Sequence, residues 1–321
     1  MKIMIYAALA VVAGPSLLFG VAGYAQEYPV KPVRMLATSS GSTDDILARH
    51  AAQKLAERWG KQVIVDNRSG LISPEAGARA APDGYTLIMA YNGNLAAAVS
   101  LYQKLAYNPI RDFAPISLYA ETPLMFLVHP SMPPANLREF IGFAKKHPGA
   151  INYASAGNGT ASHLTTELLK HVAGLDLVHV PYKGSGAAML ALVSGEVQFS
   201  SLVLPNALPQ VRAGKVKAYA VTSKKRFSGA PDVPTAAEAG LPGFESTAWF
   251  GICAPARTPR ELITKVNRDI VEILRTPAAR DWLLAQGAEP SPTSPEEFAA
   301  FIKSEIAKWK KVIEVSGATA N

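Results

Sequence analysis

Two short loops in this chain carry the residue types that bind an anion. Their sequences are Thr38-Ser39-Ser40-Gly41-Ser42-Thr43-Asp44 and Ser155-Ala156-Gly157-Asn158-Gly159-Thr160. Hydroxyl groups donate hydrogen bonds, small residues let the backbone approach a ligand closely, and Gly-Asn-Gly suits a nest of backbone N–H groups. Each loop precedes a helical pattern, and a helix N-terminus presents free N–H groups and a partial positive charge. This combination favours the capture of an anion.

The same residue types also have an ordinary structural use. Ser42, Thr43 or Asp44 could simply cap the helix that follows, but a second loop with the same placement favours binding. A third loop, Lys183-Gly184-Ser185-Gly186, also follows an apolar run. Because the chain has no G-x-x-x-x-G-K-[ST] pattern, and no G-x-G-x-x-G opens its first strand–helix unit, the sequence argues against a nucleotide.

Catalysis finds little support. The chain has no G-x-S-x-G elbow and no H-E-x-x-H pattern. His163, His171 and His179 are eight residues apart, so neighbours do not share a helix face, and His163 is expected to form a structural hydrogen bond. Cys253 is the only cysteine, which excludes an internal disulfide and a C-x-x-C metal site, and its apolar neighbours predict a buried thiol. We expect no enzyme, cofactor or metal; a hydrolase or lyase that pairs a serine with a histidine remains the alternative.

Short apolar runs alternate with helical patterns throughout the chain, and these elements must position the loops. The expected strands cover residues 33–37, 63–65, 85–90, 124–128, 151–154, 177–180, 197–200, 216–221 and 248–254. The first expected helix begins after Gly41-Ser42-Thr43, has Leu47, Ala51 and Leu55 on one face, and stops at Gly60. The other expected helices cover residues 137–146, a segment that carries Leu164, Leu168 and Val172, and residues 187–193, 259–275, 277–286 and 295–315.

Strands that alternate with helices predict α/β architecture, in which helices cover parallel sheets. The pattern occurs in two sets, so we expect two Rossmann-like lobes: residues 26–125 with 247–321, and residues 126–246. An open parallel sheet binds its ligand beyond the carboxyl ends of its strands. Two such sheets facing each other place the loops on either side of one cleft.

The first 25 residues are typical of a secretory signal peptide. Lys2 is followed by an apolar stretch over residues 3–22, and Gly23-Tyr24-Ala25 predicts cleavage after Ala25. A retained membrane anchor is the alternative, since the stretch approaches the length that spans a bilayer.

The net charge is +7, or +6 without Lys2, and the basic residues are scattered along the chain. Without a basic stripe it argues against nucleic acid and fits a mild attraction of anionic solutes.

Several longer stretches are specific enough to indicate a family. They are Ala80–Leu87, Arg111–Pro115, Asn152–Thr160, His179–Gly184, Asp232–Thr235, Glu238–Gly243 and Pro295–Phe298. In these stretches the chain resembles the Bug family of periplasmic solute-binding proteins, the receptors of tripartite tricarboxylate transporters. The resemblance runs from Tyr28 to Val315.

The resemblance implies a monomer of periplasmic solute-binding (type II-like) fold that closes on a small carboxylate or a related acid or amide and delivers it to membrane transporter subunits. The carboxylate is expected to be a di- or tricarboxylate or an aromatic acid. In such proteins two loops hold one carboxylate through backbone N–H groups and bridging waters, and these loops correspond to residues 38–44 and 155–160. We therefore predict an anion cradle, with further side chains that select the ligand. The cradle residues are Gly41, Ser42, Thr43, Gly157, Asn158, Gly159 and Thr160, and the selecting residues are Ser39, Asn92, Tyr182 and Ser201.

Three departures from the family pattern fall where ligand identity would be set. The first loop lacks the aromatic and proline of the usual Pro-Phe-x-x-Gly-Gly-x-x-Asp form. Residues 69–75 are poorer in glycine and bring Leu71 and Ile72 near the cleft, and Ser201–Pro205 replaces a segment of the Asp-Asn-Leu-Pro kind. The two apolar residues favour aromatic acids over citrate-like ones. A receptor that signals to a membrane kinase would need the same closure and remains an alternative to transport.

Overall fold

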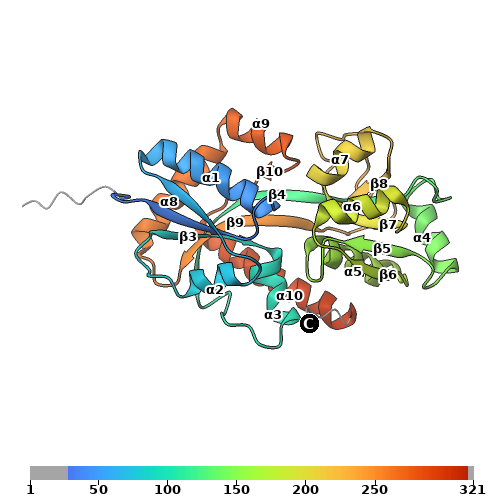
Figure 1. Cartoon of the computed structure of the whole chain (residues 1–321), viewed down its shortest axis with the longest axis horizontal. Helices are drawn as coiled ribbons and strands as arrows, with labels where there is room; N and C mark the ends of the chain where they lie inside the picture. The colour runs from blue at the N-terminus through green and yellow to red at the C-terminus, as the bar shows by residue number, and fades with distance from the viewer. Residues whose placement is uncertain (1–27, 317–321) are drawn as a thin grey trace, which may run out of the picture.

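The computed structural model describes residues 28–316, which form two α/β lobes side by side (Figure 1). Lobe 1 contains the strands β1 (Val33–Ala37), β2 (Val63–Asn67), β3 (Thr86–Tyr91), β9 (Thr247–Pro255) and β10 (Glu289–Pro290). Lobe 2 contains β5 (Asn152–Ser155), β6 (Val178–Pro181), β7 (Phe199–Val203) and β8 (Lys217–Val221). The long strand β4 (Phe113–Val128) belongs to both lobes.

Helices cover the sheet of each lobe. Those of lobe 1 are α1 (Thr43–Trp59), α2 (Ile72–Ala78), the π-helix η1 (Asn92–Ala97), α3 (Ala98–Leu101), α8 (Arg260–Leu274), α9 (Pro277–Ala285) and α10 (Pro295–Ser316). Those of lobe 2 are α4 (Leu137–Lys146), α5 (Ala161–Ala173), α6 (Ser185–Ser194) and α7 (Leu204–Arg212). The predicted spacing of Leu47, Ala51 and Leu55 on α1 is confirmed, since all three enter the lobe 1 core.

The strand order is β2-β1-β3-β9-β4-β7-β5-β6. The outer pairs are parallel, as predicted, but the centre is not, because β9 runs antiparallel to both β3 and β4, and β4 runs antiparallel to β7 and β8. The expectation of purely parallel sheets is therefore wrong at the centre. The physical reason is the connection between the lobes: the chain enters lobe 2 along β4 and returns along β9.

The sequence predicted only the last part of β4, residues 124–128. Its first part pairs with β9 as far as Pro123 opposite Thr247, and the register shifts between Pro115 and Ser117. Proline cannot donate a hydrogen bond to a β-ladder and is tolerated at such irregularities. The two prolines therefore argued against a strand in the sequence, although β4 continues across both lobes.

Helix α10 makes a third connection between the lobes. Its residues Trp309, Val312 and Ile313 share one apolar cluster with Leu101 of α3 and Leu164 of α5, so the helix rests on both sides (Figure 1). Of the elements not predicted, α2, η1, α3 and α7 are short and β10 has two residues. The predicted signal peptide lies outside residues 28–316, and none of the helices within that range is long and apolar enough to span a bilayer.

Candidate functional site

A cavity of about 700 Å³ lies where three strand–loop–helix units meet. The units are β1–α1, β5–α5 and β6–α6, and the cavity is at the carboxyl ends of these strands, as expected for open parallel sheets. The loops contribute residues 38–44, 156 with 160–162, and 183–186. A separate hollow of about 460 Å³, beside Arg260 and Glu296 on lobe 1, contains none of these loops.

The helix N-termini at this cavity leave backbone donors available. The first N–H groups of a helix have no intrahelical acceptor. At α1 and α6 the N-cap residues, Ser42 and Gly184, accept no side-chain capping bond from these groups. At α5 the hydroxyl of Thr160 accepts only from the N–H of His163. The arrangement provides partial positive charge and N–H donors from both lobes, which suits an anionic ligand.

The first loop is held in shape by the carboxylate of Asp44. This carboxylate accepts hydrogen bonds from the N–H and hydroxyl of Thr38 and from the hydroxyl of Ser42, each at 2.7 Å. Gly41, at a φ of 79°, donates its N–H to Asp45 at 2.8 Å. Burial opposes ionisation of Asp45, but hydrogen bonds from Asn67, Gly41 and Arg49 outweigh it and lower its pKa. The loop is thus organised before any ligand arrives.

We expect Asp44→Asn to loosen the first loop. The amide keeps the shape but loses the charge, and its NH₂ group cannot accept from Thr38; a hydrogen bond to a charged group contributes about 1.5–3 kcal/mol. Urea unfolding should show a stability loss of that order. Asp232→Asn, at an exposed carboxylate, is the matched control and should change nothing. Equal stability of the two variants would contradict this role for Asp44.

The second loop is built differently from the prediction. Gly157, Asn158 and Gly159 do not line the cavity, although Thr160 does. The N–H of Gly157 donates to Ser155 at 3.1 Å, and that of Gly159 donates to Nδ1 of His163 at 3.0 Å. The positions of these three residues therefore do not support the predicted cradle in this cavity, and two of their three N–H groups are already bonded within lobe 2. The structural hydrogen bond predicted for His163 is confirmed.

The structure brings together most of the remaining predicted residues. Those that line the cavity are Ser39, Gly41, Ser42, Thr43, Asn92 and Thr160. Tyr182 and Ser201 do not: the Tyr182 hydroxyl donates to Glu196 at 2.7 Å, and Ser201, fully buried, accepts from Thr166 at 2.9 Å. A direct selecting role for these two residues is not supported by their positions.

The apolar contact that was predicted for Leu71 and Ile72 is provided by other residues of the cavity. Leu71 packs against the core of lobe 1 and Ile72 is 57% exposed, so only Gly70 of that stretch reaches the cavity. The apolar wall is made instead by Tyr91, Val203, Ala248 and Phe250. The rings of Tyr91 and Phe250 stack with centroids 6.4 Å apart. An apolar surface therefore exists, but it comes from strand ends and from the residue before α7.

Sequence reasoning missed the third loop as part of the site. Lys183, Gly184, Ser185 and Gly186 all line the cavity. The loop was set aside because it fits no phosphate-binding pattern. Its place after a strand and before a helix, identical to that of the other two loops, was the signal that could have identified it. Lys183 forms no ion pair with any residue of the described range 28–316, so its charge is available to a ligand.

A serine–histidine pair of the kind that a hydrolase would need does exist, but neither residue lines the cavity. Ser155 Oγ lies 2.6 Å from Nε2 of His179, whose ring stacks on His163 with centroids 4.1 Å apart. Ser155 is fully buried and is absent from the cavity lining. Within residues 28–316 no group of three or more potential ligands could hold a metal ion. The site offers anion binding and an apolar wall.

Two α/β lobes joined by crossing strands, with helix N-termini around one cavity, define a bilobal solute-binding protein. The chain belongs to the tripartite tricarboxylate transporter family receptors (TctC), whose family model matches residues 47–318. Protein BugT of Bordetella pertussis is 34% identical over 299 residues, which cover 92% of each chain. The predicted resemblance to the Bug family is confirmed.

Solved structures of similar sequence have the same fold. R. palustris Rpa4515 with adipate has a TM-score of 0.83 at 34% identity and covers 91% of this chain and 99% of its own. MatC (Rpa3494) from Rhodopseudomonas palustris with bound malate has a TM-score of 0.78 at 36% identity and covers 89% and 100%. The predicted periplasmic-binding-protein architecture is therefore confirmed.

Proposed function

We propose that this chain captures a small carboxylate between its two lobes and presents it to the membrane subunits of a tripartite tricarboxylate-type transporter. The observation that carries the proposal is the meeting of three helix N-termini and Lys183 at one cavity. Adipate and malate in Rpa4515 and MatC support a carboxylate as the ligand. Capture works by closure, because contacts made in both lobes favour the closed state.

The proposal includes where and how the chain works. It acts as a binding protein in the periplasm after cleavage near Ala25, with residues 26–125 and 247–321 as one lobe and residues 126–246 as the other. The matching family is described as a receptor family, and neither Ser155 nor His179 lines the cavity.

The lining favours a ligand with one carboxylate head and an apolar or aromatic body. Among the lining residues the side-chain charges are those of Lys183 and Asp44, and Asp44 already accepts three hydrogen bonds. Tyr91 and Phe250 offer stacked rings opposite the loops. A second carboxylate would meet N–H and hydroxyl groups but no second cation, so an aromatic or aliphatic monocarboxylate fits better than citrate.

A thermal-shift screen of the mature protein against mono-, di- and tricarboxylates, aromatic acids included, tests the proposal. A ligand at about 100 times its dissociation constant should add roughly 2.7 kcal/mol of stability. We expect the largest shift from acids with a single carboxylate and an apolar body. If no acid raises the melting temperature and none co-purifies, the carboxylate proposal is wrong; turnover of a bound acid would instead support an enzyme.

A further inference from the structure

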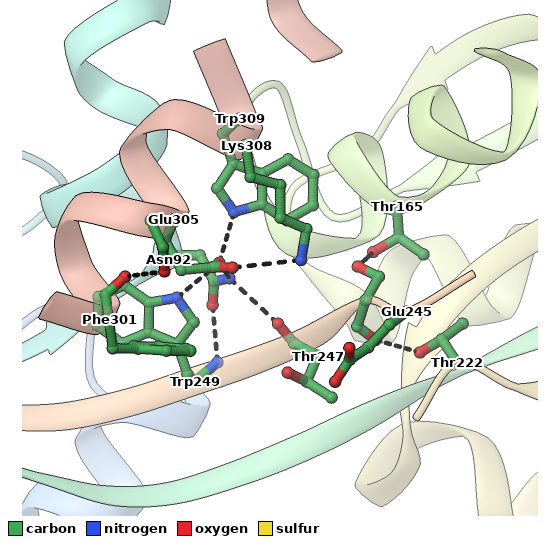
Figure 2. A network of polar contacts seen from close by, with 12 residues as sticks. Asn92, Thr165, Thr222, Glu245, Thr247, Trp249, Phe301, Glu305, Lys308 and Trp309 are labelled. Atoms are coloured by element: carbon green, nitrogen blue, oxygen red, sulfur yellow. Dashed lines mark hydrogen bonds and ion pairs between the residues drawn. The ribbon is translucent and has the colours of Figure 1, made fainter. Parts of the chain in front are cut away.

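A buried carboxylate on α10 lies behind the cavity wall and does not line it. Glu305 is 6% exposed, and its Oε2 accepts from the indole N–H groups of Trp249 at 3.0 Å and Trp309 at 2.8 Å (Figure 2). Lys308 forms an ion pair with Oε1 at 3.2 Å. Removing a charge from water costs several kcal/mol unless it is well paired. An apolar side chain at this position would avoid the free energy of desolvating a charge. We therefore look for a functional role of Glu305.

Asn92 connects Glu305 to the cavity. Its Nδ2 lies 3.4 Å from Glu305 Oε2 and donates to the carbonyl of Thr247 at 3.1 Å, while its Oδ1 accepts from the N–H of Trp249 at 2.7 Å (Figure 2). The ladder of β3 with β9 ends at Tyr91 opposite Phe250. The Asn92 side chain thus continues the pairing where the backbone turns into η1. Because Glu305 only accepts, it reinforces the amide orientation that the Thr247 carbonyl and the Trp249 N–H also select.

The segment that Asn92 holds is the point where the chain returns from lobe 2. Ser246 is anchored in lobe 2, since its Oγ lies 2.6 Å from the hydroxyl of Thr165 and its carbonyl accepts from Thr222. Thr247 is anchored in lobe 1 by Asn92 and by a hydrogen bond to Glu121 at 3.2 Å. One peptide bond therefore joins two anchored points, and Figure 2 shows the contacts on both sides of it.

We propose that Glu305 is a positioning residue for the ligand site. It helps to hold Asn92 in this orientation, and through Asn92 it holds the lobe 1 end of the Ser246–Thr247 segment, which we take as the hinge between the lobes, and the adjoining cavity wall at Ala248 and Phe250. Ligand affinity then depends on a side chain that does not reach the ligand. The inference rests on the proposed function of the cavity as a carboxylate site. A carboxylate that only stabilised the core would change the melting temperature and leave affinity untouched.

Two variants separate positioning from stability. Glu305→Gln has the same size but loses the charge and one acceptor, so the Asn92 amide loses its charged acceptor and is held by Thr247 and Trp249 alone. Trp309→Phe is the matched control, because it removes one donor to Glu305 and leaves Asn92 and Trp249 bonded. Calorimetry uses the acid that most raises the wild-type melting temperature. We expect Glu305→Gln to weaken its binding about tenfold or more and Trp309→Phe to change it less than twofold, although both lower the melting temperature.

A double-mutant cycle tests whether Glu305 acts through Asn92. Groups that act through one another give non-additive effects, so Glu305→Gln should weaken binding much less in an Asn92→Leu background than in the wild type. Additive effects, or a Glu305→Gln variant that melts lower and binds as well as the wild type, would overturn the proposal. If Glu305→Gln does not fold, the spin-label measurement below is made on Asn92→Leu alone. That variant leaves Glu305 bonded to both indoles.

A measurement without ligand keeps the inference separate from the proposed function. Spin labels at Glu57→Cys on α1 and Leu190→Cys on α6 occupy exposed sites on the two lobes, while Cys253 is buried. We expect one narrow distance distribution for the wild type and for Trp309→Phe, and a broader or shifted one for Glu305→Gln and Asn92→Leu. Identical distributions in all four proteins would overturn the hinge. Failure of every acid to bind the wild type would overturn the proposed function, whatever the spin labels show.

Discussion

Replacing Lys183 by alanine should weaken carboxylate binding about 10- to 100-fold and leave the free protein as stable as before. A charge-assisted hydrogen bond contributes about 1.5–3 kcal/mol, and 1.4 kcal/mol corresponds to a factor of ten in affinity. Lys183 is exposed at the cavity and pairs with no residue of the range 28–316. Its loss therefore breaks nothing in the free protein. Isothermal titration with the acid found in the screen, beside a melting curve, measures both quantities.

Two control variants separate a direct contact of Lys183 with the ligand from a general loss of positive charge. Lys61→Ala removes an equal charge at an exposed site away from the cavity, so it reports the long-range attraction of anions alone. Lys183→Arg keeps the charge and should retain most of the affinity. The weakening caused by Lys183→Ala should shrink only slightly at high salt, because a contact pair is screened less than distant charges. Unchanged affinity in Lys183→Ala would show that backbone N–H groups suffice and that Lys183 is not part of the site.

Sequence reasoning was most successful where a residue's role depends on its own segment. Gly60 ends α1 in the left-handed region, at a φ of 62°, as its place after an apolar-periodic stretch predicted. Asn136 was not singled out, yet α4 spans the predicted residues 137–146, because spacing within one helix is a local property. The first loop also lines the cavity as predicted, since its position follows from the strand before it and the helix after it.

The misses depend on contacts between distant segments. Gly159 was predicted to be an anion donor, but His163 accepts from its N–H, and the His163 ring is itself held against His179 of β6. Tyr91 and Phe250 form part of the apolar wall of the cavity because they are paired in the antiparallel ladder of β3 and β9. A local sequence pattern does not predict this pairing of distant strands. Glu305 was not singled out in the sequence, because its burial depends on its packing against the indoles of Trp249 and Trp309. Tertiary contacts decide these roles.

Lowering the pH from 7 to 5 should remove several kcal/mol of folding stability. Burial, as the main cause, lowers the pKa of His50, His163 and His179 from 6.5 to about 4. The native state therefore holds these side chains neutral while the unfolded chain takes up protons, so stability is lost as pH falls from about 6.5 to about 4. One pKa unit corresponds to about 1.4 kcal/mol, which gives about 2 kcal/mol per histidine at pH 5. Urea unfolding at the two pH values measures the difference.

His50 offers the clearest single test. Its ring stacks on Trp282 with centroids 3.9 Å apart, and its Nδ1 lies 2.6 Å from the Tyr119 hydroxyl. His50→Phe keeps the stacking and cannot titrate, so its loss between pH 7 and 5 should be smaller than that of the wild type by about 2 kcal/mol. His171→Gln, at an exposed position, should lose as much as the wild type. Equal losses in all three proteins would exclude His50 as a source of the pH dependence.

The other two histidines link this pH dependence to the second loop. His163 accepts from the Gly159 N–H through Nδ1, and a proton at that nitrogen would turn the acceptor into a donor. The carboxylates with lowered pKa values, such as Asp45 and Asp269, lose their contribution only at lower pH, because their usual values near 3.8 lie below this window. Between pH 7 and 5 the loop over residues 155–160 should therefore gain faster amide hydrogen exchange, corrected for intrinsic rates, while the loop over residues 38–44, which Asp44 and Asp45 hold, should not.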